Sequence, residues 1–600
     1  MRDLLPRVFL TTTIPASSPV LLAAEVGSEP KALVALVVFT IASLGLGVVA
    51  NRFVGREAGF LKKYFLGNRS LGAFAVALTA AVMSGGTFLG FPAFVYSYGW
   101  ITALWIGSYM VAPLTVLGIM GKRIGRMARS TGAITLPDLF RERFGSPALG
   151  LITSVLVMFF LTCNLIPQFK AGGVIMKKVL PSAATDWAKS PPSDDLDIKV
   201  DLDTGYIIGL TIFTATVTAY TAYGGFLAAV WTDVFQSVVM AIGVLILLPL
   251  SLWSAGGLAT ATARGVHDAG IGFAFGPGAG RSFHPITLAV SFFFMWAITS
   301  MGQPSTLVRL MAFRDTRTLR YSMIYLTIYN FIIYIPLILI FIAARSVVPG
   351  LSKPDEAMPS LVIKLANPYV AGLIMAAPYG AVMSTVSGFL LIIASGLTRD
   401  VYQRFLRPRA SEKEISLMGH VATVGVGLVV ALTALRPPEF LQLIIIFSSA
   451  GMAAAFLAPA LMGVYWRRAT AAGAIAASLA GSGVVIVLYA LGMAPIAGTI
   501  LERLLPANPD IGPASSFRPY YLLGFDPCVW GLASSLVAGI AVSLITKPPD
   551  EARLSIVFDD GPAVDAPQRG VESKALDDER TAAEPGAAGS RIKGSQDLKT

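Results

Sequence analysis

The chain is poor in charge, in cysteine and in histidine, and each shortage argues against a class of protein. Asp, Glu, Lys and Arg make up 14% of its 600 residues, whereas about a quarter of the residues of a soluble chain are charged. The two cysteines, Cys163 and Cys528, lie far apart in the sequence, which argues against a disulfide framework and a metal cluster. The apolar stretches hold no nucleophile beside a basic partner and no cluster of His or Cys, so the sequence does not predict an enzyme.

Long apolar stretches take the place of the missing charge. Hydrophobic residues make up 55% of the chain, and its mean hydropathy is +0.69. A helix of about 20 apolar residues crosses a bilayer, and segments of this kind recur along the whole sequence. We therefore predict an all-α polytopic membrane protein with about 13 transmembrane helices, at residues 32–51, 70–97, 100–121, 148–178, 205–223, 228–252, 285–303, 319–345, 366–397, 416–435, 440–465, 470–492 and 527–546.

Basic residues gather in alternate loops between these segments. Because cytoplasmic loops of membrane proteins carry an excess of Lys and Arg, we predict a multi-pass protein of the cell's inner (plasma) membrane, with its N-terminus outside and its C-terminus in the cytoplasm. The bias also accounts for the net charge of +11 without a nucleic-acid partner. The basic segments are 52–69, 122–129, 309–320, 399–409 and 467–468.

The two ends of the chain differ in composition from its middle. Residues 1–31 combine basic residues with a weakly apolar stretch, which fits either an external tail or a cleaved signal peptide. Residues 547–600 are rich in charge, Gly and Ala, and they predict a disordered cytoplasmic tail. A single transmembrane domain is therefore expected at residues 32–546.

Glycine and proline interrupt two of the predicted helices. The second helix reads SGGTFLGFP from Ser84 to Pro92, and the seventh reads SMGQP from Ser300 to Pro304. One such break alone is ordinary in a membrane helix, because neighbouring helices satisfy the freed backbone groups. These two breaks lie five helices apart, as they would if residues 70–252 and 285–465 were inverted repeats. Interrupted helices at matching places in two repeats indicate the binding site of a secondary transporter.

The ninth helix carries three hydroxyl groups in the sequence GAVMSTVSG, at Ser384, Thr385 and Ser387. Such hydroxyls often bond back to a carbonyl four residues earlier. The alternative is that Ser384, Thr385 and the carbonyl of Ala381 join two carbonyls of the broken second helix around a hard monovalent cation. The matched breaks favour the cation. Because no Asp, Glu or His lies near the middle of a predicted span, sodium is favoured over a proton, which would need a titratable group there.

Four long motifs resemble segments of the sodium:solute symporter family, and they follow one another in the family's order. They lie at residues 64–90, 223–243, 302–315 and 377–404, and the resemblance covers most of the chain from about 60 to 470. It implies a leucine-transporter-type fold with a 5+5 inverted repeat and an added N-terminal helix. The family's sodium ligands would be the carbonyls of Ala80, Met83 and Ala381 and the hydroxyls of Ser384 and Thr385.

Two further positions bear on this resemblance. Asp233 matches an acid of the family that is implicated in sodium coupling, although a carboxylate at the start of a helix can also act as a cap. Some members carry Asp or Asn at the position of Val82, so that polar group is absent here.

The resemblance implies a symporter that imports a small polar organic solute by alternating access, with sodium as the coupling ion and no other cofactor. Residues 347–385 and 436–440 look most like the sodium/pantothenate branch, whereas GQP at 302–304 is similar to the proline branch. The solute would therefore be pantothenate, another small carboxylate or an amino acid. A membrane sensor or a channel of the same fold is the alternative, and the sequence does not determine the oligomeric state.

Candidate solute contacts lie beside the two breaks. Glutamine and serine offer hydrogen-bond donors and acceptors, and tryptophan offers a flat wall with a polar edge, but each position also fits ordinary helix packing. Lys170, near the outer end of the fourth helix, would either meet the carboxylate of an entering solute or only extend to the outer headgroups. The candidate contacts are Thr87, Gln168, Trp296, Ser300 and Gln303.

Overall fold

The computed structural model describes most of the predicted transmembrane domain. The predicted ligand Met83, the neighbouring Val82 and most of the two predicted tails lie outside the described residues. Residues 551–558, within the segment expected to be disordered, form a helix. The described residues are 30–52, 73–80, 84–181, 204–275, 285–313, 315–435, 441–493, 508–509, 511 and 515–558.

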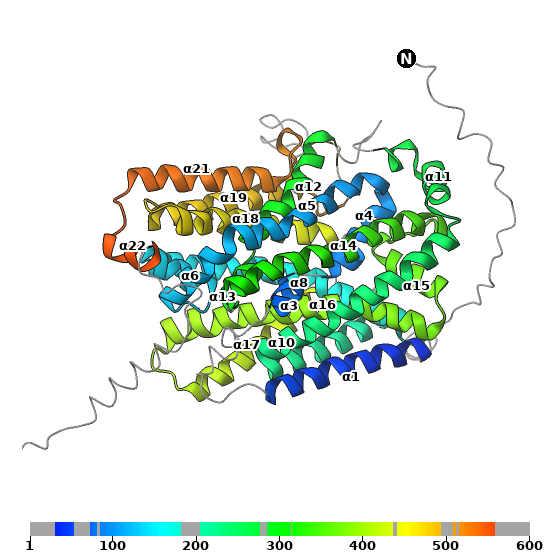
Figure 1. Ribbon diagram of the computed structural model, residues 1–600, viewed down its shortest axis with the longest axis horizontal. Helices are drawn as coiled ribbons and strands as arrows, with labels where there is room; N and C mark the ends of the chain where they lie inside the picture. The colour runs from blue at the N-terminus through cyan, green and yellow to red at the C-terminus, as the bar shows by residue number, and fades with distance from the viewer. Residues whose placement is uncertain are drawn as a thin grey trace, which may run out of the picture.

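The described residues contain nine long helices, which run side by side (Figure 1). The longest, α10, contains Gly225 with φ 61° and ψ −163°, a backbone conformation that glycine adopts readily, so it is two successive spans. The long helices are α1 (Pro30–Arg52), α8 (Pro147–Val179), α10 (Thr204–Ser254), α14 (Thr316–Val347), α16 (Pro368–Ser395), α17 (Glu412–Thr433), α18 (Leu441–Tyr465), α19 (Ala471–Met493) and α21 (Pro527–Ile545).

Shorter helices make up the interrupted spans and cover the two ends of the bundle. They are α3 (Ala73–Ala80), η3 (Gly86–Gly90), α4 (Phe91–Tyr98), η4 (Gly99–Thr102), α5 (Ala103–Pro113), η5 (Leu114–Gly121), α6 (Lys122–Thr131), α7 (Leu136–Phe144), α11 (Leu258–Ala269), η6 (Ile271–Phe273), α12 (Ile286–Thr299), η7 (Ser300–Gly302), α13 (Pro304–Ala312), η8 (Pro354–Glu356), α15 (Ala357–Leu365), η9 (Gly396–Leu406), η10 (Leu522–Gly524) and α22 (Glu551–Phe558).

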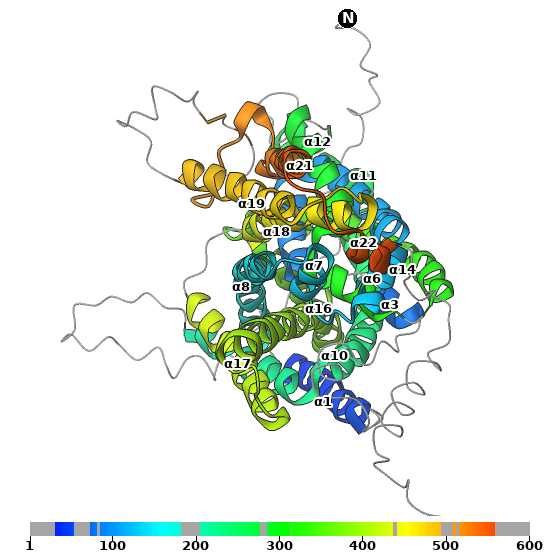
Figure 2. The ribbon, with the colours of Figure 1, turned by 90° about the vertical axis from the view of Figure 1, so that its left-hand side faces the viewer.

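Two helices form the centre of the bundle, and others surround them. The most apolar stretch of α18 is entirely buried, and that of α16 is 83% buried, whereas those of α1 and α21 are only 22% and 28% buried. In the view along the helices, α16, α18 and α8 lie inside, while α1, α17 and α21 lie at the rim (Figure 2). The outer helices turn large apolar side chains outward, Val38, Ile41 and Val537 among them. This is the arrangement that a lipid environment favours.

Polar caps determine where several long helices begin. The side chain of Ser146 accepts a hydrogen bond from the Leu149 amide at the start of α8, and Asn367 accepts one from Val370 at the start of α16. Ser411 and Glu414 form a complete capping box on α17. Each cap satisfies amides that the first helical turn leaves without a partner.

Both predicted interruptions are present. In the seventh span, Gln303 has an extended backbone with φ −74° and ψ 123°, and the axes of the helices on either side of it differ by 48°. In the second span, Ser84 lies outside any helix, and the amides of Ser84 and Gly85 donate to the side chains of Thr87 and Gln168, before a π-helix begins at Gly86. By length and composition, the described residues contain ten spanning helices, or up to twelve when each of two bent pairs counts as one span. The first bent pair includes parts of the predicted spans 70–97 and 100–121, which is why this count is lower than thirteen.

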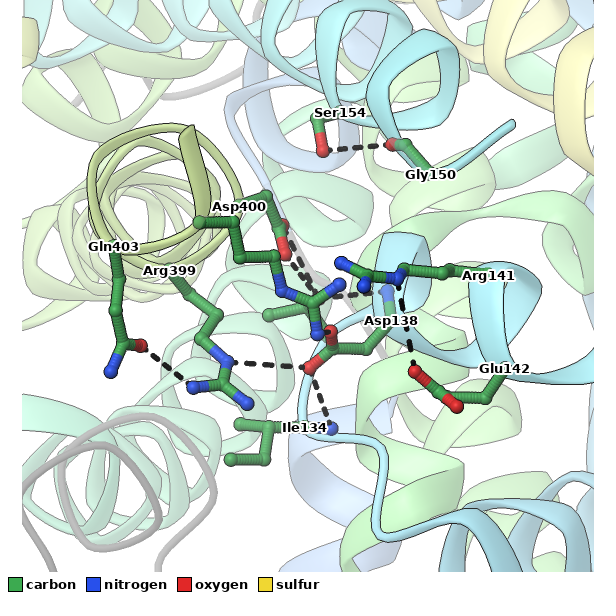
Figure 3. A network of polar contacts seen from close by, with 11 residues as sticks. Ile134, Asp138, Arg141, Glu142, Gly150, Ser154, Arg399, Asp400 and Gln403 are labelled. Atoms are coloured by element: carbon green, nitrogen blue, oxygen red, sulfur yellow. Dashed lines mark hydrogen bonds and ion pairs between the residues drawn. The ribbon is translucent and has the colours of Figure 1, made fainter. Parts of the chain in front are cut away.

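A network of ionic contacts joins α7 to η9 at one end of the bundle, called the α7 end below (Figure 3). Asp138, which is 2% exposed, pairs with Arg404 and lies 3.7 Å from Nε of Arg399. The hydroxyl of Thr135 donates to both carboxylate oxygens of Asp400 at 3.3 Å. Because η9 continues α16, this network anchors the central helix to the short helix α7.

Candidate functional site

A cavity lies where the two interrupted spans meet α16 and α18. About 830 Å³ of space within it is not filled by atoms, and part of this space is open to the outside. None of the described side chains that line it is charged. Its polar lining residues are Ser84, Tyr109, Asn164, Trp296, Ser300, Gln303, Ser305, Thr306, Asn330, Thr385, Gln442 and Ser449.

Three of the predicted solute contacts line this cavity. Trp296 stacks on Tyr109, with ring centroids 5.1 Å apart, and Tyr109 stacks in turn on Tyr334 at 4.2 Å. The Gln303 side chain donates to the carbonyl of Ser449 on α18 at 3.1 Å. The hydroxyl of Ser300 donates to the carbonyl of Trp296. The cavity therefore has a flat aromatic wall beside neutral hydrogen-bonding groups.

The other two, Gln168 and Thr87, satisfy the broken backbone of the second span and are not among the lining residues. Oε1 of Gln168 accepts a hydrogen bond from the Gly85 amide at 2.7 Å. The Thr87 hydroxyl accepts one from the Ser84 amide at 3.3 Å and lies 3.4 Å from the Tyr334 hydroxyl. Because a buried amide without a partner costs about 1–3 kcal/mol, both side chains stabilise the interruption.

The hydroxyls of the ninth span lie beside this interruption. A Cβ atom built on Gly85 would lie 3.2 Å from Cγ2 of Val382. The Thr385 hydroxyl donates to the Ala381 carbonyl at 3.1 Å. This is the bond to a carbonyl four residues earlier that the sequence offered as the alternative to a cation. Two of the predicted sodium ligands are thus already joined to one another. Ala80 is the last residue described for α3, and Met83 lies outside the described residues.

Asp233 lies in the second half of α10, eight residues beyond the kink at Gly225. It is 4% exposed, and its Oδ2 atom lies 3.7 Å from Nη2 of Arg309 on α13. Ser384 of α16 lies near the same carboxylate. Because Asp233 is more than one turn into this half of the helix, capping does not account for its position.

Lys170 is already paired, so neither interpretation of its role describes this conformation. Its ammonium group lies 3.1 Å from Oδ2 of Asp355 in η8, and the amide of Leu441 donates to the same oxygen at 3.2 Å. Lys178 and Glu356 form a second pair at 2.7 Å. Burial raises the pKa of Asp355 above its usual range, and the charge of Lys170 opposes that rise. These contacts close η8 against α8 and α18 at the end of the bundle opposite α7, called the η8 end below.

Several polar residues of the cavity were not expected from the sequence. Asn164 donates to the Ser448 hydroxyl at 2.7 Å, and Asn330 donates to the Tyr109 carbonyl at 3.0 Å. The side chain of Gln442 is packed against the second span, since a Cβ atom on Gly90 would lie 2.4 Å from its Oε1 atom. A polar side chain inside an apolar run was the only signal available, and it does not indicate a partner.

Comparison with known proteins agrees with this geometry. The model of the sodium:solute symporter family matches residues 64–184 and 198–481. Over 466 residues the chain is 31% identical to the sodium/pantothenate symporter of Haemophilus influenzae, a match that covers 76% of this chain and 90% of that protein. Over 491 residues it is 32% identical to the sodium/pantothenate symporter of Escherichia coli, covering 79% and 95% respectively.

Among solved structures, a sodium-coupled sialic acid symporter in a substrate-bound, outward-open state is similar to this chain. The TM-score is 0.62 at 16% sequence identity, and the match covers 87% of this chain and 99% of that one. The likeness confirms the predicted all-helical, leucine-transporter-type membrane fold.

Proposed function

The chain belongs to the sodium:solute symporter family, and from that premise we propose that it imports a small polar carboxylate of the pantothenate type together with sodium. Sodium-coupled solute transport is the common activity of this family, and a family made up of transporters points away from an enzyme. The cavity beside the two interrupted spans is the observation that carries the proposal. The two relatives at 31% and 32% identity, both sodium/pantothenate symporters, support this solute class.

The solute would be held in this cavity by uncharged groups. Pantothenate has a carboxylate, an amide and hydroxyl groups, which pair with the neutral donors and acceptors of Asn164, Gln303 and Gln442. Trp296 and Tyr109 would provide apolar contact for its hydrocarbon part. Gln168 and Thr87 would act indirectly, by maintaining the interrupted backbone.

Sodium would bind between the second and ninth spans, at the carbonyls of Ala80, Met83 and Ala381 and the hydroxyls of Ser384 and Thr385. Five neutral oxygens suit a monovalent ion that must later leave. In the alternating-access mechanism, bound sodium orders the interruption, and the solute then closes its entry path. Each net charge that crosses 100 mV contributes about 2.3 kcal/mol, sufficient for a roughly fiftyfold solute gradient. Because a carboxylate solute cancels the charge of one sodium ion, this gain requires at least two sodium ions for each solute molecule.

The orientation follows from the basic residues. The α7 end carries Arg123, Arg126 and Arg129 on α6 and Arg141 and Arg143 on α7, so it would face the cytoplasm. The η8 end would then face outward, in the plasma membrane, and the N-terminus would lie outside.

Uptake into vesicles tests the proposal. Purified protein is reconstituted, an inward sodium gradient is imposed, and labelled pantothenate is supplied with proline and other small acids as competitors. We expect accumulation above the external concentration, only with sodium, and strongest competition from pantothenate-like acids. Equilibration without accumulation would indicate a channel. Sodium-dependent uptake of proline alone would replace the solute class and leave the family assignment intact.

Substitution of Gly90 by alanine is expected to weaken solute binding. The added Cβ atom would lie 2.4 Å from Oε1 of Gln442, so the glutamine must leave its position in the cavity. The solute then loses its proposed hydrogen bond to Gln442, and a buried polar group left without a partner costs about 1–3 kcal/mol. The KM for uptake should therefore rise about tenfold at saturating sodium.

Gly118→Ala provides the control for this substitution. Gly118 lies in η5, where the nearest atom to an added Cβ, Sδ of Met323, is 3.7 Å away, so its KM should not change. An unchanged KM in Gly90→Ala would remove Gln442 from the solute site.

A further inference from the structure

A second cavity lies on the α7 side of the hydroxyls of the ninth span. It contains about 510 Å³ of unfilled space, and Asp233, Arg309 and Ser305 supply polar groups to its wall. Gly388 and Ser395 also line it, and they follow Thr385 by about one and three helical turns. Ser305 also lines the central cavity. The second cavity therefore lies along α16, between the proposed sodium site and the α7 end.

The ion pair in this cavity is loose. Nη2 of Arg309 and Oδ2 of Asp233 are 3.7 Å apart, whereas strong arginine–carboxylate pairs make two parallel bonds of about 2.7–2.9 Å. The side chains of Arg309 and Asp233 are only 10% and 5% exposed. Within the described part of the chain, Oδ1 of Asp233 and Nη1 of Arg309 have no hydrogen-bond partner. Burying two charges costs free energy that is regained only when the geometry is good and the remaining polar atoms are hydrogen-bonded. Stability alone therefore does not explain this pair.

The elements that supply this pair belong to the transport machinery. Arg309 is on α13, the half of the seventh span that follows the interruption at Gln303. Asp233 is on α10 and lies near Ser384 of α16, a proposed sodium ligand. A shift of α13 relative to α10 would therefore change the distance between the two charges at one end of the proposed sodium path.

We propose that Arg309 is a tethered cation that neutralises Asp233 whenever sodium is absent from this cavity, and that sodium leaving the ninth span displaces it. The inference rests on the proposed sodium site at Ser384 and Thr385. A single carboxylate neutralises one cation at a time, so sodium and the guanidinium group compete for Asp233. When sodium departs, Arg309 takes its place, and no bare carboxylate is left in the membrane. Arg309 thus promotes sodium release as a positioning residue.

Sodium-dependent thermal stabilisation of the purified full-length protein tests this competition. Sodium chloride is titrated against choline chloride at constant ionic strength, and the midpoint of the stabilisation is measured, because a bound ion raises stability by mass action. Arg309→Gln removes the competitor, so the sodium midpoint should fall about tenfold. The maximal rate of uptake in vesicles should also fall, because release becomes slow. Arg309→Lys keeps a cation and should remain within about threefold of the original midpoint.

A double-mutant cycle separates competition from a merely structural role. Asp233→Asn should raise the sodium midpoint, and adding Arg309→Gln to it should produce no further change, because the carboxylate for which they compete is gone. If Arg309→Gln alone fails to fold, Asp233→Asn and the double variant, in which the buried carboxylate is neutral, still test the inference, because their sodium midpoints should be equal to one another and above that of the original protein. An unchanged midpoint in Arg309→Gln, or an equal effect of this substitution with and without Asp233, would overturn the inference.

The sodium midpoint of a variant of the ninth span tests the proposed sodium site separately from the role of Arg309. If Ser384→Ala with Thr385→Ala leaves the sodium midpoint unchanged, the proposed sodium site is wrong. If that double variant shifts the midpoint and Arg309→Gln does not, the site stands and the role of Arg309 is wrong.

Discussion

Alanine at both Ser384 and Thr385 is expected to raise the sodium concentration for half-maximal uptake about a hundredfold. The double substitution removes two proposed oxygen ligands, each taken to contribute as much as a hydrogen bond to a charged group, about 1.5 kcal/mol at the least. It also removes the hydrogen bond of 3.1 Å by which Thr385 holds the Ala381 carbonyl, the third proposed ligand on this helix. Uptake at several sodium concentrations, with the amount of protein in the membrane measured in parallel, gives the shift.

Thr423 provides the control for this variant, because its hydroxyl also bonds to the carbonyl four residues earlier in its own helix. The hydroxyl of Thr423, buried on α17, donates to the Gly419 carbonyl at 2.8 Å, and Thr423→Ala should leave the sodium response unchanged. If the Ser384/Thr385 variant reached the membrane normally and kept its sodium response, the ninth span would bind no coupling ion.

Substitution of Asp138 by asparagine is expected to have a large effect on stability and, through it, on transport. Asp138 forms ion pairs with Arg404 and Arg399 at the α7 end (Figure 3). Breaking a buried pair by removing one partner costs about 3–5 kcal/mol, and we expect the lower end because both arginines are partly exposed. The variant should unfold at a clearly lower temperature and transport at less than about a tenth of the original rate.

Glu142, one turn further along α7, provides a matched control. Among the described residues it forms an ion pair with Arg141 alone, at 3.9 Å, and both side chains are at least a third exposed, so Glu142→Gln should change neither measurement, as is usual for surface pairs. A melting temperature of Asp138→Asn equal to that of the control would mean that the network does not hold η9 to α7.

Local features of this protein could be predicted from its sequence, and long-range contacts could not. Apolar runs located the long helices, because the bilayer thickness determines the length of a span. Glycine and proline located both interruptions, because each disfavours helix in its own immediate neighbourhood. The three solute candidates of the seventh span, Trp296, Ser300 and Gln303, line the cavity for the same reason, since they flank a break.

What escaped prediction depends on residues that are distant in the sequence. Lys170 pairs with Asp355, which is 185 positions away, and Gln168 caps an amide 83 positions away. Neither partner can be found from periodicity or composition, because a side chain carries no local signal of what it will meet. Gly90 was interpreted as a helix breaker, yet its lack of a side chain also makes room for Gln442 on α18. That second role appears only when two spans are placed together.

The complete enclosure of α18 has a consequence for how the protein is made. In the finished molecule, the most apolar stretch of this helix is surrounded by other helices, and it carries Gln442, Ser448 and Ser449 into the interior. A newly synthesised span nevertheless enters the bilayer before its neighbours have assembled around it. Its remaining residues must therefore be hydrophobic enough for the isolated span to insert into the bilayer, although the helix does not contact lipid along this stretch in the folded protein.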